Sequence, residues 1–121
     1  MIPCTDPALK ASPNEEDTHL MIDWAPVITQ ILDDLRQKAS IPIIAARFHN
    51  TLAEIIARVA QHIGEARIVL SGGCFQNRYL TERTVQRLEQ EGYRVYWHQR
   101  VPPNDGGIAL GQLYAAGVGG E

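Results

Sequence analysis

The sequence predicts an α/β protein, a βαβ unit with flanking helices. Residues 67–71 form a short β-branched run that ends at Gly72-Gly73, and residues 93–97 form a second run rich in valine and aromatic residues. The segment between them, 77–91, repeats apolar and threonine side chains every four residues, which is typical of one helix face. A strand, a helix and a strand in this order predict parallel strands joined by a right-handed crossover.

Two longer helices are expected before this unit and one after it. The first covers about residues 24–37 and follows Asp23, a candidate N-cap. The second covers 42–63, where isoleucine, leucine, phenylalanine and valine mark one face, and Gly64 ends it. The last is expected at 105–116, after a proline-containing turn.

Residues 1–20 are expected to form an irregular lead-in to the domain at 21–121. They hold three of the seven prolines and a short acidic cluster, and they show no apolar period. Two strands do not make a self-sufficient sheet. Either a strand lies within the lead-in, or the chain is part of a larger domain, and we favour the second interpretation.

Composition limits the possible partners. A net charge of −3 over 121 residues argues against a nucleic-acid surface, because affinity for phosphate backbones comes mainly from clustered lysine and arginine. No apolar run approaches the ~20 residues of a membrane span, so no membrane association is expected. Cys4 and Cys74 lie far apart in unlike contexts, which argues against a disulfide framework or zinc cluster and favours a cytoplasmic setting.

The first candidate site is Ser71-Gly72-Gly73-Cys74-Phe75-Gln76-Asn77, where the first strand passes into a helix. Two glycines let a backbone approach a ligand closely, and a helix N-terminus offers N–H groups to an anion. The carboxyl ends of parallel strands are also where α/β folds bind ligands. A tight turn that merely needs small residues explains the same pattern, and both interpretations stay open.

The second candidate site is Pro102-Pro103-Asn104-Asp105-Gly106-Gly107, at the start of the last helix. The Asp105 carboxylate, followed by two glycines, could reach a divalent cation or a substrate amide. Aspartate is also a favoured N-cap, and its charge suits the helix dipole. The two roles are not exclusive.

Other chemistry-bearing residues receive structural interpretations. Cys74 lies beside the glycine pair, but a catalytic cysteine needs a base and no histidine is close in sequence. We interpret it as a small buried apolar residue. No His-x-x-x-His pair occurs, so a metal site made by this chain alone is not expected. Trp24 and Trp97 are interpreted as core anchors.

Three segments together resemble the last stretch of HypF-type [NiFe]-hydrogenase maturation carbamoyltransferases. They are residues 46–53 (ARFHNTLA), 69–78 (VLSGGCFQNR) and 101–112 (VPPNDGGIALGQ), in the family's order, and the likeness covers about residues 22–116. The main departure is Cys74, where the family pattern has a small apolar residue such as valine.

The resemblance implies that residues 21–121 are the C-terminal portion of a carbamoyltransferase domain. Its fold would be the second lobe of an actin-like ATPase (ribonuclease H-like) domain, similar to the tRNA threonylcarbamoyl transferase subunit. The whole enzyme would use carbamoyl phosphate and ATP to make carbamoyl adenylate. It would then carbamoylate the C-terminal cysteine of a partner, HypE, for synthesis of the hydrogenase cyanide ligand.

The resemblance also implies roles for four residues. Gly72 and Gly73 match the nucleotide-contacting loop, and Asn77, at the start of the next helix, would bond the ligand or pin the loop. Asp105 matches an acidic ligand of a divalent metal ion, whose histidine pair belongs to the first lobe. This chain alone is expected to be inactive. The alternative is a non-catalytic nucleotide-binding or self-association fragment, for which unpaired sheet edges would favour a homo-oligomer.

Overall fold

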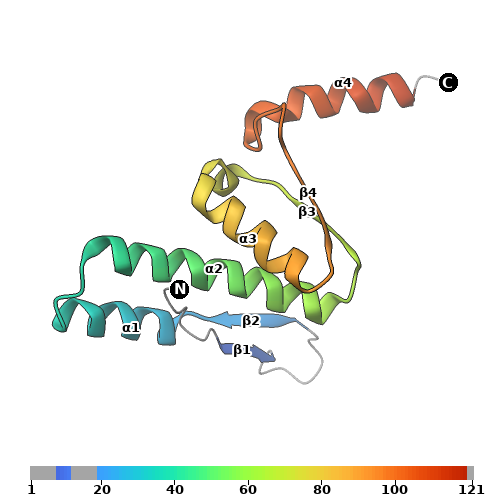
Figure 1. The fold of residues 1–121 in the computed structure, drawn as a ribbon. Helices are drawn as coiled ribbons and strands as arrows, with labels where there is room; N and C mark the ends of the chain where they lie inside the picture. Colours follow the sequence, from blue (N-terminus) through green and yellow to red (C-terminus); the bar gives the residue numbers. More distant parts are fainter. Residues whose placement is uncertain (1–7, 12–18, 120–121) are drawn as a thin grey trace. The chain divides into compact units, whose positions relative to one another are not determined.

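The computed structural model describes residues 8–11 and 19–119. The chain divides into two compact units, Met1–Ile63 and Gly64–Glu121, and each is described by itself (Figure 1). Within the described ranges, no helix is both long and apolar enough to cross a membrane.

The first unit contains a small antiparallel sheet and two helices. Strand β1 (Ala8–Ala11) pairs with β2 (Leu20–Asp23), with Ala8 opposite Asp23 and Ala11 opposite Leu20. Helix α1 (Ala25–Arg36) follows directly, and α2 (Ile41–Ile63) comes after a short turn. The helices predicted at 24–37 and 42–63 are therefore confirmed.

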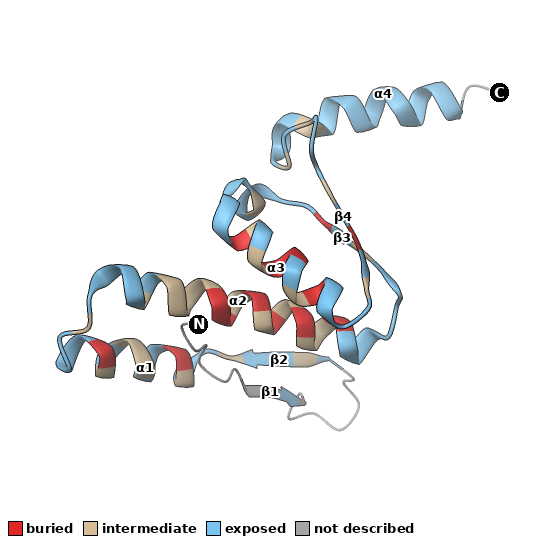
Figure 2. Cartoon of the chain, in the orientation of Figure 1, coloured by how far each residue is buried: buried red, intermediate tan, exposed pale blue. Residues whose placement is uncertain are grey.

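Helices α1 and α2 contact each other, and a buried polar cluster joins them. The Asp34 side chain on α1 is 6% exposed and forms an ion pair with Arg47 on α2. Gln30 Nε2 also donates to Asp34 Oδ1, at 3.0 Å. Apolar burial on α1 is centred on Val27, while the buried residues of α2 lie between Asn50 and Ala60 (Figure 2). A buried charge needs such partners, so this cluster favours one register of the two helices.

Strand β1 corrects the expectation of an irregular lead-in at residues 1–20. Ala8–Ala11 and Leu20 belong to strands, while residues 1–7 and 12–18 lie outside the described part of the chain. The segment shows no apolar alternation because this sheet depends on backbone pairing and on an ion pair between Lys10 Nζ and Asp23 Oδ2, at 2.6 Å. These features leave little signal in a sequence pattern.

The second unit is built on the predicted βαβ arrangement. Strands β3 (Arg67–Leu70) and β4 (Arg94–Trp97) are parallel, and α3 (Arg78–Gln90) connects them. Helix α3 contacts β4 and buries Leu80 and Leu88. The prediction of strands at 67–71 and 93–97 with a helix at 77–91 is confirmed.

The two sheets are separate, so β1 does not extend the β3–β4 pair. A strand does lie within residues 1–20, but it leaves the parallel pair two-stranded in the described chain. One face of this pair is uncovered, since Val69 is 71% exposed and Tyr96 is 45% exposed. Parallel sheets normally have cover on both faces.

The last predicted helix is preceded by a turn of 3₁₀-helix. Helix η2 (Asp105–Gly107) leads into α4 (Ile108–Val118), whose described side chains are all exposed. The prediction of a helix at 105–116 is confirmed in place, with a tighter first turn. Trp97 is half-buried, as a core anchor would be, but Trp24 is 43% exposed and that interpretation of it is wrong.

Candidate functional site

The loops that follow β3 and β4 are joined by a backbone hydrogen bond. The Gly72 N–H donates to the Pro103 carbonyl oxygen at 2.9 Å. Because β3 and β4 are parallel, their carboxyl ends meet at one edge, and this bond fixes the two loops beside each other. The two candidate segments predicted from the sequence therefore lie beside each other.

The first loop presents open space at its glycines. Gly72 has a φ of +102°, which L side chains rarely adopt, and a Cβ placed there would meet nothing within 4 Å. A Cβ on Gly73 would meet only Asn104 Cβ, at 3.9 Å. A tight turn therefore explains Gly72, because its positive φ favours glycine. Packing does not require a glycine at position 73, so the sequence-based interpretation of close approach by a ligand stays open for it.

The two glycine N–H groups differ in availability. That of Gly72 is already bonded to the Pro103 carbonyl oxygen. That of Gly73, the first residue of helix η1 (Gly73–Gln76), makes no hydrogen bond with the described residues. The nucleotide role of the pair stays a prediction, with Gly73 as the candidate donor.

Asn77 fixes the far end of this loop. Its Oδ1 accepts the Leu80 N–H at 3.0 Å and caps α3. Thr81 Oγ1 lies 2.9 Å from the Phe75 carbonyl oxygen and 3.0 Å from that of Asn77, within donating distance of both. Of the two roles expected for Asn77, the structure shows the pinning of the loop, and the ligand contact stays a prediction.

The second loop depends on its glycines for packing. A Cβ on Gly107 would lie 2.9 Å from the Pro102 carbonyl oxygen, and one on Gly106 would lie 3.0 Å from Asn104 Oδ1. Asn104 Oδ1 accepts the Gly106 N–H at 2.9 Å, so Asn104 is the N-cap here. These two glycines have a structural explanation that requires no ligand.

Asp105 is exposed in the first turn of η2. The alternative that it is the N-cap is wrong, because Asn104 takes that position. Its charge still suits the helix dipole. In residues 8–11 and 19–119, no group of three or more His, Cys, Asp or Glu could hold a metal ion. Asp105 alone is not a metal site, and its role as one ligand stays a prediction.

Two further side chains at this edge were not predicted from the sequence. Ser71 Oγ lies 3.0 Å from His98 Nε2. Each residue directly follows its strand, in step with the paired residues Leu70 and Trp97, so a correct register would have predicted the contact. Cys74, interpreted from the sequence as buried, is an exposed free thiol, and that interpretation is wrong.

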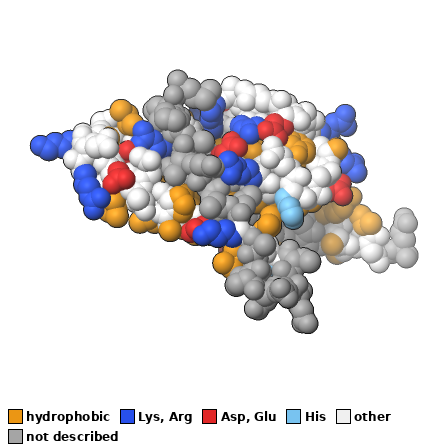
Figure 3. Space-filling model, turned by 90° about the horizontal axis from the view of Figure 1, so that it is seen from below, with side chains coloured by type: hydrophobic (Ala, Val, Ile, Leu, Met, Phe, Trp, Pro, Cys, Tyr) orange, Lys and Arg blue, Asp and Glu red, His pale blue; other side chains and the backbone are white. Residues whose placement is uncertain are grey.

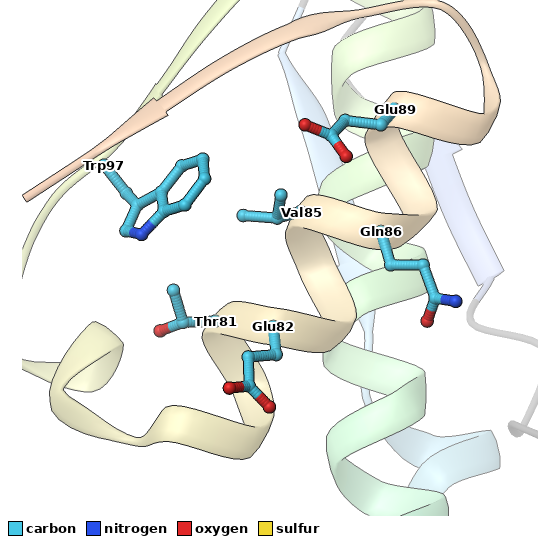
Figure 4. Close-up of a pocket in the computed structure, with 6 residues that line it drawn as sticks. All are labelled: Thr81, Glu82, Val85, Gln86, Glu89 and Trp97. Atoms are coloured by element: carbon cyan, nitrogen blue, oxygen red, sulfur yellow. The ribbon is translucent and has the colours of Figure 1, made fainter.

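Behind the loops, a mostly apolar pocket of about 270 Å³ lies between α3 and Trp97 (Figure 4). Thr81 and Val85 face the indole ring, and Glu82 and Glu89 stand at the rim. Arg78 Nε donates to Glu82 Oε1 at 2.6 Å, and this hydrogen bond raises the pKa of the Arg78 guanidinium.

Basic and acidic side chains both occur on the face seen in Figure 3, so the described surface there is of mixed charge.

Comparison with known proteins gives the family. Residues 5–112 match the family described as "Carbamoyltransferase, Kae1-like Domain, second subdomain". A carbamoyltransferase HypF from Synechocystis sp. is 41% identical over 102 residues, covering 84% of this chain and 13% of that protein. Carbamoyltransferase HypF2 from Cupriavidus necator is 41% identical over 76 residues, covering 60% and 9%. This chain thus spans a small part of the relatives' length.

Solved structures agree with this assignment. A crystal structure of full-length HypF, in a phosphate- and nucleotide-bound form, has a TM-score of 0.81 and is 35% identical. The likeness covers 93% of this chain and 15% of that one. A crystal structure of HypF from T. kodakarensis, 23% identical with a TM-score of 0.57, supports the fold alone. The matched region includes the predicted glycine and aspartate loops, and the chain belongs to the HypF carbamoyltransferase family, in the second subdomain of its Kae1-like domain.

Proposed function

We propose that this chain forms one wall of the carbamoyl-transfer site of a HypF-type enzyme. The whole enzyme uses carbamoyl phosphate and ATP to form carbamoyl adenylate. It then transfers the carbamoyl group to the C-terminal cysteine of a HypE-type protein, for hydrogenase cyanide-ligand synthesis. The relatives' common name, carbamoyltransferase, supports this proposal. Sparse cysteines in unlike contexts support a cytoplasmic setting.

The hydrogen bond from Gly72 to Pro103 is the observation on which the proposal depends. It brings a glycine pair with open space and an exposed carboxylate to the carboxyl edge of a parallel sheet. This edge is where α/β folds bind ligands. The likeness to a HypF structure in a nucleotide-bound form supports a nucleotide as that ligand, within an actin-like (ribonuclease H-like) domain.

The residues of the first loop fit one side of a nucleotide. Gly72 and Gly73 leave the space that a Cβ would fill, the Gly73 N–H can donate to a phosphate oxygen, and Asn77 holds the loop on α3. The nucleotide supplies the activated carbamoyl group. The chain contributes positioning and electrostatic stabilisation, and the acceptor's thiolate is the nucleophile.

The described residues do not by themselves form a site for the divalent metal ion. We propose that Asp105 supplies one carboxylate ligand and that the others come from residues outside this chain. An exposed carboxylate at the mouth of the nucleotide loop suits this role, because hard divalent cations prefer oxygen ligands.

Substitution of Asp105 by asparagine in the full-length enzyme tests the proposal. Asn104 caps the helix, so Asp105→Asn should leave folding intact while it removes the anionic oxygen. Metal content and carbamoylation of the HypE-type partner should then fall together. Carbamoyl-adenylate formation, which the family resemblance assigns to another domain, should persist. Metal analysis, a partner carbamoylation assay and the thermal unfolding midpoint provide the measurements.

The matched control is Glu65→Gln, which removes an exposed carboxylate from the loop that precedes β3. This loop is not at the carboxyl ends of the two strands. It should leave metal content and transfer unchanged. Normal metal content with normal transfer in Asp105→Asn would contradict the assignment of Asp105.

A second candidate function is self-association of the isolated chain. Helix α4 exposes its large apolar side chains, and the β3–β4 face around Val69 and Tyr96 is uncovered. Such surfaces mark contacts with other protein. Sedimentation velocity of the isolated chain over a range of concentrations tests this, and a monomer throughout that range would exclude it. The large exposed apolar side chains on α4 that would form this contact are Ile108, Leu110, Leu113, Tyr114 and Val118.

A further inference from the structure

A serine–histidine pair lies at the carboxyl edge of the β3–β4 sheet, immediately before the glycine loop. Ser71 Oγ and His98 Nε2 are 3.0 Å apart, and both residues are exposed. Ser71 is covalently joined to Gly72, so the histidine ring stands next to the proposed nucleotide loop. None of the roles proposed above uses this pair.

The pair lies on the face of the sheet turned away from α3. Side chains alternate along a strand, and Val69 and Tyr96, two residues before Ser71 and His98, are exposed. The intervening Leu70 belongs to the opposite, buried face. The His98 ring is therefore open to a molecule that approaches the carboxyl edge from the uncovered side.

Ser71 can determine which ring nitrogen of His98 carries the proton. When the serine oxygen accepts a hydrogen bond from Nε2–H, the neutral imidazole carries its lone pair on Nδ1. The Nδ1 atom is then a proton acceptor that the bond to Ser71 does not occupy. A cysteine thiol has an ordinary pKa near 8.5, so near pH 7 only a few per cent is thiolate, and transfer to it gains from a base.

We propose that His98, held by Ser71, is the general base for the acceptor thiol. This inference rests on the proposed function. The thiol sulfur forms a bond to the carbamoyl carbon, and the bond from that carbon to the adenylate phosphate oxygen breaks. The leaving AMP takes that electron pair, and the thiol proton passes to His98 Nδ1 and then to water. Ser71 is a positioning residue.

Histidine is the side-chain type that ordinarily titrates between pH 5 and 8, whereas arginine, tyrosine, aspartate and cysteine ordinarily titrate outside that range. A difference in pH–rate profile between the wild type and a variant that lacks His98 would therefore implicate that side chain. The other titratable groups on its sheet face and in the adjoining loops are Arg67, Arg94, Tyr96, Cys74, Arg100 and Asp105.

The test is His98→Gln in the full-length enzyme with carbamoyl phosphate, ATP and the HypE-type partner. Glutamine can still bond Ser71 but cannot accept the proton. Partner carbamoylation at pH 7 should fall by about a hundredfold or more, while carbamoyl-adenylate formation continues. The wild-type rate should level off once the base is neutral. The rate of the variant should instead follow the fraction of preformed thiolate and keep rising toward the ordinary thiol pKa of about 8.5, and added imidazole should restore part of its rate near neutral pH.

Two further variants separate this role from a structural one. Ser71→Ala should lower transfer less than His98→Gln and keep the wild-type form of the pH profile. His62→Gln, at an exposed histidine on α2, should match the wild type. If the wild-type enzyme carbamoylates the partner and His98→Gln does so with the same rate and pH profile, the inference about His98 is overturned and the proposed function stands.

A loss in His98→Gln that imidazole does not reverse, together with a lowered thermal midpoint, would also overturn it and leave a structural pair. Absence of partner carbamoylation by the wild-type enzyme would instead contradict the proposed function itself.

Discussion

The glycines of the site differ in what requires them. At Gly106 and Gly107 the chain's own atoms occupy the space beside the backbone, at 3.0 and 2.9 Å from a hypothetical Cβ. At Gly72 and Gly73 that space is open. A glycine enforced by packing contributes to folding, whereas one that borders open space is available for close approach of a ligand. A substitution at Gly73 tests ligand contact more clearly than one at Gly72. At Gly72 the positive φ means that any side chain would also strain the backbone.

A matched pair of alanine substitutions tests this distinction. Gly107→Ala places Cβ against the backbone oxygen of Pro102, which cannot move away as a flexible side chain could. We expect a loss of about 1–3 kcal/mol in the free energy of unfolding. Gly73→Ala meets only ordinary contact with Asn104 and should unfold near the wild-type midpoint. Denaturant unfolding of both variants provides the measurement, and equal stabilities would contradict the distinction.

Residue types and their order predicted the two loops, but individual roles within them depended on three-dimensional contacts. Asparagine and aspartate cap helices about equally well, so the sequence could not decide between Asn104 and Asp105. The exposure of Cys74 depends on how η1 turns. The Ser71–His98 pair depends on strand register, which a pattern of four-residue strands does not specify.

Among the elements, the long helices were predictable because apolar periodicity over many residues is a strong signal. The parallel strands were predictable because a β-branched run ends at Gly72-Gly73 before the helix, and a run of valine and aromatic residues follows Gly92 after it. Strand β1 was missed because Ala8–Ala11 contains no β-branched or aromatic residue, and its structure depends on pairing with β2. Short strands of this kind are defined by their partner more than by their own sequence.

The start of α3 gives a prediction about a single cap. Asn77 Oδ1 accepts the Leu80 N–H, so Asn77→Ala should cost about 0.5–2 kcal/mol in the free energy of unfolding. Asn77→Asp retains an accepting oxygen and should cost little. Comparison of both variants with the wild type in thermal unfolding checks this. If Asn77→Asp destabilises the chain as much as Asn77→Ala, the cap does not account for the role of Asn77.

The β1–β2 sheet gives a prediction about acid. The ion pair with Lys10 and the N–H of Ala25 hold the pKa of the Asp23 carboxyl below its ordinary value of 3.8. A carboxyl with a lowered folded-state pKa stabilises the fold above its unfolded-state pKa, and this contribution is lost as pH falls through the folded-state value. Stability of the wild type should therefore decline below about pH 4 more steeply than that of Asp23→Asn.

Unfolding free energies of these two proteins measured from pH 2 to 6 check the prediction. Because Lys10 is exposed and Asp23 is only half-buried, added salt should reduce the difference between them. Identical pH dependence in both would show that the ion pair does not persist in solution.

For the whole molecule, the exposed apolar residues indicate what the chain lacks. Leu113 and Tyr114 on α4 are 72% and 73% exposed, and one face of a parallel sheet is uncovered. The chain also spans 13% of the length of a HypF relative. No sequence pattern in the described part of the chain identifies what covers these surfaces. The family match supplies that context.

The isolated chain should bind ATP weakly, because the described part contains one wall of the proposed cleft. A micromolar complex requires about −8 kcal/mol. The Gly73 N–H could add about 1.5–3 kcal/mol through a hydrogen bond to a charged phosphate oxygen, and Asp105 repels phosphate unless a cation lies between them. These contributions fall well short of the requirement. Calorimetry with ATP and Mg²⁺ should therefore show little heat for the isolated chain and clear binding for the full-length enzyme. Micromolar binding by the isolated chain would mean that its own residues form a complete nucleotide site, and the apolar pocket beside Trp97 would then be the place to look for the adenine ring.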